Sequence, residues 1–135
     1  MAHRSSDVSF LMNSGTYSGE TYKFTLAEQN GQKMWAVNRV FQPSPSMRKE
    51  QLNIGISLKE NIPLSGAKEL KISSTLQEQL EIVADESTYI TMMGLDGVSR
   101  DVRVDSTGFT VETIMDEKGR PAEFVAMVKL WSMYK

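Results

Sequence analysis

The chain has no cysteine, and its only histidine is His3, close to the N-terminus. Without cysteine the protein can form no disulfide, hold no thiolate-bound metal and use no thiol nucleophile. A single histidine cannot supply a metal cluster, and a catalytic triad needs a second ordered group beside it. Because the two commonest catalytic side chains are so scarce, we predict that the protein is not an enzyme and has no catalytic residue.

The net charge is also small, and the chain has no long apolar run. The 15 Lys and Arg residues nearly balance the 17 Asp and Glu residues, which leaves a formal charge of −2. This balance offers no broad attraction for phosphate, so we expect no nucleic-acid partner. No window approaches the roughly 20 apolar residues of a membrane helix, and residues 1–7 lack the apolar run of a signal peptide. We expect a protein made in the cytoplasm, not secreted by a signal peptide and without a membrane partner.

Carboxylates are the remaining candidates for chemistry, and most of them lie at predicted turns. Asp forms turns readily because its side chain hydrogen-bonds the backbone two residues further on. The spacing of Asp96, Asp101 and Asp105 does not match the calcium-binding loop of an EF-hand. We interpret these residues as turn formers and predict no metal ligand, no cofactor and no small-molecule substrate.

The length of 135 residues is that of one ordinary domain, and 40% apolar with 24% charged residues is typical of a globular chain. We therefore treat residues 1–135 as a single domain. We divide it into an N-terminal arm or loop region (1–19), a hairpin (20–41), a Pro/Ser loop (42–48) and the remaining strands and helix (50–135).

Short alternating runs separated by turn residues predict mostly strands. Asn30-Gly31 is the dipeptide most typical of a tight hairpin turn, and it separates an alternating run from an apolar-rich one. The most regular alternation follows the Pro/Ser loop and predicts a half-buried strand. Its inward-facing residues are Leu52, Ile54, Ile56 and Leu58.

Residues 74–85 allow two interpretations. Leu76, Leu80 and Val83 lie at helical spacing on one face, and Thr75 with Glu78 fits a capping box. Apolar residues in the same segment also alternate as in a strand. We prefer a short α-helix at about 75–84 and leave the strand as the alternative.

The last third predicts a meander of strands at 88–93, 98–104, 109–115 and 122–132, joined by turns that combine Asp with Gly. In total we expect seven to eight strands and one helix. The predicted fold class is mainly β, as an antiparallel β-sandwich or a small barrel.

The final strand is apolar on both faces. Phe124, Ala126, Val128 and Leu130 share one face, while the other is broken only by Lys129. A half-exposed sheet needs one polar face, so the strand is either covered on both sides or lies at an interface. The candidate interface residues on this segment are Val125, Met127, Trp131, Met133 and Tyr134.

A charged strand at 97–104 is followed by Glu112 and by a charged turn and strand start at 116–123. This order resembles the closing hairpins of small β-rich bacteriophage tail and baseplate proteins. The resemblance lies C-terminal to residue 88 and assigns no role to any single residue. It implies a chemically inert β-domain that docks copies of itself or other virion proteins.

Two hypotheses about function follow. The first is a non-enzymatic structural or assembly subunit, such as a virion component, whose partners are copies of itself or other structural proteins. The alternative is a monomeric β-domain that binds a small ligand, a peptide or a glycan. The oligomeric state separates the two, since only an assembly subunit needs a protein neighbour.

Overall fold

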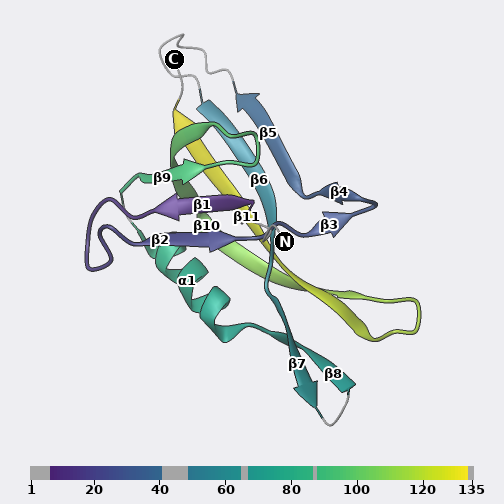
Figure 1. Cartoon of the computed structure of the whole chain (residues 1–135). Coiled ribbons are helices and arrows are strands. Elements are labelled where there is room, and N and C mark those ends of the chain that lie inside the picture. Colours follow the sequence, from purple (N-terminus) through teal and green to yellow (C-terminus); the bar gives the residue numbers. More distant parts are fainter. Residues whose placement is uncertain (1–6, 41–48, 65–66, 87, 134–135) are drawn as a thin grey trace.

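The computed structural model describes residues 7–40, 49–64, 67–86 and 88–133. In this part the chain is mainly β with one helix, which confirms the predicted fold class (Figure 1). The predicted Pro/Ser loop at 42–48, His3 and Tyr134 lie outside the described residues. The helix has 12 residues, and no helix in the described part is long and apolar enough to cross a membrane.

The main sheet has seven antiparallel strands in the order β2-β1-β9-β10-β11-β6-β5. Their bounds are β1 Val8–Leu11, β2 Thr21–Phe24, β5 Trp35–Val40, β6 Lys49–Ser57, β9 Ile90–Met93, β10 Ser99–Met115 and β11 Pro121–Met133. Two short hairpins complete the β structure: β3 Glu28–Gln29 with β4 Gln32–Lys33, and β7 Lys59–Leu64 with β8 Ala67–Ile72.

The main sheet bends so strongly that its two ends face each other across the core. In Figure 1, β1, β2 and β9 run across the direction of β6 and β11. Just after β2, Leu26 forms an isolated bridge with Ile56, and the Ala27 N–H donates to the Gly55 carbonyl at 2.8 Å. The sheet does not close into a barrel, so the arrangement is that of a sandwich.

The core lies between these layers and confirms the predicted inward face of β6. Leu52, Ile54, Ile56 and Leu58 are all at most 1% exposed. The opposite layer contributes Phe10 and Phe24, whose rings meet edge to face with centroids 5.8 Å apart. Burial of apolar side chains from both layers is the main stabilising term of such a fold.

The helix α1, Ser74–Asp85, is present as preferred, but its N-cap was assigned wrongly. Ser73, not Thr75, caps it, because the Ser73 hydroxyl accepts from the Leu76 N–H at 3.3 Å. The Ser73 N–H donates to the Leu58 carbonyl at 2.7 Å, which fixes the start of the helix at the end of β8. Leu80 and Val83 are fully buried and attach the helix to the core.

The long hairpin predicted at 20–41 is wrong, although its turn is correct. Asn30 and Gly31 both have positive φ, 55° and 79°, as a tight primed turn requires. The turn joins only the two-residue strands β3 and β4. β2 pairs instead with β1, which lies in the segment predicted as an arm or loop (1–19), and β5 pairs with β6.

The meander β9-β10-β11 is confirmed, but the strands predicted at 98–104 and 109–115 form one strand, β10. Residues 105–108 are a bulge and not a turn between strands. Val104 pairs with Leu130 and Phe109 with Val128, so only Lys129 separates the two pairing points on β11. A bulge re-aims the strand without ending its pairing, which is why β10 continues along β11.

The buried register of β6 leads to a stability prediction for Ile54. Ile54→Ala should lower the free energy of unfolding by about 2–5 kcal/mol, because it removes buried methyl groups and leaves a cavity. Asn53→Ala, on the opposite face of the same strand, is the control and should cost no more than about 0.5 kcal/mol. Urea denaturation followed by circular dichroism measures both. Equal losses for the two variants would show that the register is wrong.

Candidate functional site

The two faces of β11 have different surroundings, because β11 is a central strand paired with β6 and with β10. One face enters the core, where Ala126, Val128 and Leu130 are buried. The other face, here called the outer face, brings together three of the predicted interface residues. These are Val125, which is buried, and Met127 and Trp131, which are half-buried.

Met34 covers part of the outer face. A Cβ atom on Gly55 would lie 2.8 Å from the Met34 sulfur and 3.0 Å from Val125 Cγ1. A glycine inside a strand often marks such a close approach of another side chain. Val125 is therefore covered by the chain itself, which leaves Met127 and Trp131 as the more accessible members.

Trp131 is held by a hydrogen bond to the bulge of β10. Its Nε1 donates to Asp105 Oδ1 at 2.7 Å. The other carboxylate oxygen of Asp105 accepts from the Thr107 hydroxyl at 2.6 Å and from the Thr107 N–H at 3.2 Å. The Thr107 hydroxyl and the Trp131 indole lower the pKa of Asp105 to about 2. The bulge thus orients the indole over the outer face.

Met127 lies between two shallow hollows of the outer face. They have volumes of about 230 and 290 Å³, and both are lined by Asn53 and Met127. Met133 is the last residue of β11. The structure therefore places Val125, Met127, Trp131 and Met133 along one strand, and of these it leaves Met127 and Trp131 accessible on the outer face.

The end of the β10–β11 hairpin projects from the body of the molecule (Figure 1). Across this arm, residues 110–122, every side chain is exposed except that of Asp116, which is half-buried. Its apolar members include Val111, Ile114 and Met115, which are 36%, 38% and 56% exposed. Among the described residues of the hairpin, these are the large apolar side chains that are exposed, so the arm is its most open apolar surface.

The turn of the arm is well ordered by backbone hydrogen bonds. The Asp116 N–H donates to the Arg120 carbonyl at 2.8 Å. The Asp116 carboxylate accepts from the Lys118 and Arg120 N–H groups, each at 2.9 Å, and these bonds lower its pKa. The sequence predicted both strands of the arm, but not that they extend beyond the core. A usable signal was the loss of regular apolar alternation after residue 110.

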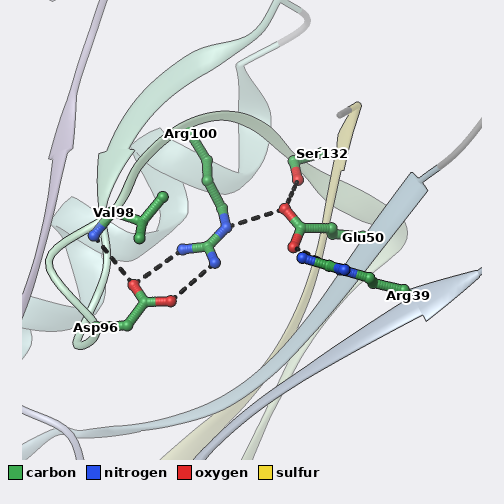
Figure 2. A network of polar contacts seen from close by, with 6 residues as sticks. All are labelled: Arg39, Glu50, Asp96, Val98, Arg100 and Ser132. Atoms are coloured by element: carbon green, nitrogen blue, oxygen red, sulfur yellow. Dashed lines mark hydrogen bonds and ion pairs between the residues drawn. The ribbon is translucent and has the colours of Figure 1, made fainter. Parts of the chain in front are cut away.

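A network of polar contacts closes one end of the core (Figure 2). Arg100 donates through Nε to Glu50 at 3.1 Å and through both terminal nitrogens to Asp96, at 3.0 and 2.8 Å. Glu50 also accepts from the Ser132 hydroxyl at 3.4 Å and lies 3.9 Å from Arg39. Both Glu50 and Arg100 are nearly buried, and each neutralises the charge of the other.

Trp35 packs against this network. The Arg100 guanidinium lies 6.0 Å from the centre of the Trp35 ring, at the edge of cation–π range. A Cβ on Gly94 would come within 2.5 Å of the Trp35 ring and 2.9 Å of Asp96 Oδ1. Gly94 is therefore required for the turn to approach the ring. The network joins β5, β6, β10 and β11 and has a structural role.

Other polar groups give little support for chemistry. No group of His, Cys, Asp or Glu in the described part of the chain is arranged to hold a metal ion. A hollow of about 540 Å³ lies between the end of α1 and the bulge and is open to solvent. Its lining includes Asp85, Glu86, Arg103 and Asp105.

Comparison of the chain with models of protein families, with curated proteins and with solved structures found no match.

The network predicts how stability changes with acidity. The hydrogen bonds from Arg100 and the Val98 N–H lower the pKa of Asp96 below 3.8. A lowered folded-state pKa contributes stability that is complete above about pH 5 and is lost as the pH falls through the folded value. Asp96→Asn should destabilise the protein at neutral pH, and its difference from the wild type should shrink towards pH 2.

Thermal melts of the two proteins between pH 7 and pH 2 measure this difference. Asp101→Asn, at an exposed carboxyl on β10, the strand that follows the turn of Asp96, controls for the loss of one negative charge. A gap for Asp96→Asn that stays constant across the range would contradict the prediction.

Proposed function

We propose that the protein is a non-enzymatic assembly subunit that docks copies of itself or neighbouring structural proteins. The observation that carries this proposal is the projecting arm with its exposed Val111, Ile114 and Met115. The virion component implied by the bacteriophage resemblance is the specific form of the proposal.

The energetics of the arm support a neighbour. An isolated two-stranded hairpin is marginally stable in water and gains from apolar contact on a face. Burial of exposed apolar area contributes about 25 cal/mol per Å² before the cost of association is subtracted. Met115 alone is 56% exposed, so a partner that covers the arm gains from its side chain and its neighbours. Met is also common on contact surfaces that adapt to a partner.

The carboxylates support a structural interpretation over acid catalysis. A general acid at neutral pH needs a raised pKa. The pKa values of Asp96, Asp105 and Asp116 are instead lowered by hydrogen bonds that stabilise a turn or a bulge. These groups stay ionised and hold the backbone in place.

The alternative, a monomeric module that binds a small ligand, a peptide or a glycan, is favoured by one observation. The hollow between α1 and the bulge has a mostly polar lining and is the size of a small ligand. The hollow is open to solvent, so it would bury little of a bound ligand's surface. We therefore place this function second.

The assembly proposal predicts that the arm controls self-association or capture of a structural partner. Met115→Lys should weaken assembly about tenfold or more, since it replaces exposed apolar area with a solvated charge. Met93→Lys, at an exposed methionine on β9 (46%, against 56% for Met115), is the matched control and should leave assembly unchanged. Both variants should keep the far-UV circular dichroism of the wild type.

Light scattering coupled to size exclusion at tens of micromolar measures the assembled fraction, and Trp131→Lys tests the outer face in the same way. A wild type that remains monomeric and captures no structural protein from its native source would overturn the proposal. The monomeric binding module would then take its place.

A further inference from the structure

The main sheet ends at β5, which pairs on one side with β6. The other side of β5 forms no strand pair within the described residues. β5 has six residues, contains no proline and shows no register shift against β6. Proline, bulges, very short length and charged side chains protect sheet edges, and of these β5 has only one charged side chain, Arg39.

The hydrogen-bond pattern shows which backbone groups of β5 point to this edge. Gly55 donates to the Met34 carbonyl at 3.0 Å, and Trp35 is the residue opposite Ile54. In an antiparallel pair, successive residues direct their N–H and C=O groups alternately to opposite sides. Ala36 and Asn38 therefore direct theirs towards β6, and Trp35 and Val37 direct theirs towards the edge.

The outward N–H and C=O groups can hydrogen-bond a second extended strand, and β5 of a second copy can supply that strand. In an antiparallel register centred on Val37, the Val37 N–H of each copy meets the Val37 carbonyl of the other. The same register places Trp35 opposite Arg39 and Ala36 opposite Asn38. Arg39 is the only charged residue of β5, and it meets an aromatic ring and not another cation.

The charges and sizes of the side chains make this register self-complementary. Arg39 keeps its contact with Glu50, 3.9 Å away, because the pairing uses the backbone of the strand. Ala36 and Asn38 are exposed, small and uncharged, so two copies approach without like-charge contact. The opposite edge strand, β2, has only four residues and carries Lys23, a typical protecting residue.

We propose that two copies of the protein associate through antiparallel pairing of their β5 strands about a twofold axis at Val37. The two seven-stranded sheets then form one continuous sheet across the dimer. This inference rests on the proposed assembly function and names a second copy as the partner at this edge. The arm and the outer face of β11 remain available for other contacts.

The test introduces charges at Ala36 and Asn38, the exposed positions that lie opposite each other in the proposed dimer. In Ala36→Lys/Asn38→Lys, each lysine lies opposite a lysine of the second copy, and in Ala36→Glu/Asn38→Glu each glutamate opposes a glutamate. Each variant alone should dimerise about tenfold more weakly than the wild type. An equimolar mixture should recover to within about threefold, because every cross-strand pair becomes Lys opposite Glu.

A pair of proline variants tests the hydrogen-bond pattern independently. Val37→Pro removes an N–H that points to the edge, so it should weaken the dimer and keep the fold. Asn38→Pro removes an N–H directed at β6 and should lower the thermal stability of the subunit itself. The reverse pattern would overturn the assignment of the edge.

Sedimentation velocity and native mass spectrometry follow dimers in the separate and mixed samples. A wild type that assembles while the β5 variants assemble equally well would overturn the inference and leave the proposed function standing. A mixture that fails to recover would also overturn it, because the register would be wrong. A wild type that stays monomeric at tens of micromolar would overturn both the inference and self-docking.

Discussion

The register of β11 between β6 and β10 determines how the core strands and the neighbouring turns pack. It places Val128 beside Ile54 and Leu130 beside Leu52, so that the apolar rows of two strands enter one core. A shift of one residue would turn Lys129 inward and the core row outward. β11 has 13 residues and β6 has nine, and the part of β11 that extends past β6 forms one side of the arm.

The same register creates an electrostatic requirement at the other end of the core. It puts Glu50 opposite Ser132 on the inward face, where a lone carboxylate would be costly to desolvate. Arg100 neutralises Glu50, and Asp96 in turn holds Arg100 through two hydrogen bonds. The turn that carries Asp96 approaches Trp35 only because residue 94 is glycine. One strand register thus determines the residues of a neighbouring turn.

The surfaces on which the assembly proposal rests belong to strands that extend beyond the core, β10 and β11, or lie at its edge, β5. The arm continues the β10–β11 hairpin beyond the layers, and the bulge at 105–108 positions Asp105 to hold Trp131. β5 ends the sheet after the β6 register has set which of its backbone groups point outward.

Features that depend on local pattern could be predicted from the amino-acid sequence. Alternation identified the buried face of β6, helical spacing identified α1 through Leu80 and Val83, and Asn30-Gly31 identified a tight turn. The sequence also indicated that β11 is apolar on both faces. The pairing of the strands became visible only in the folded chain: β2 pairs with β1, β5 pairs with β6, and β10 continues across a bulge. The fold likewise determines Ser73 as the helix cap, because a hydrogen bond to Leu58 fixes that residue. Periodicity records which side of a segment is buried, whereas strand pairing depends on contacts between segments far apart in the chain.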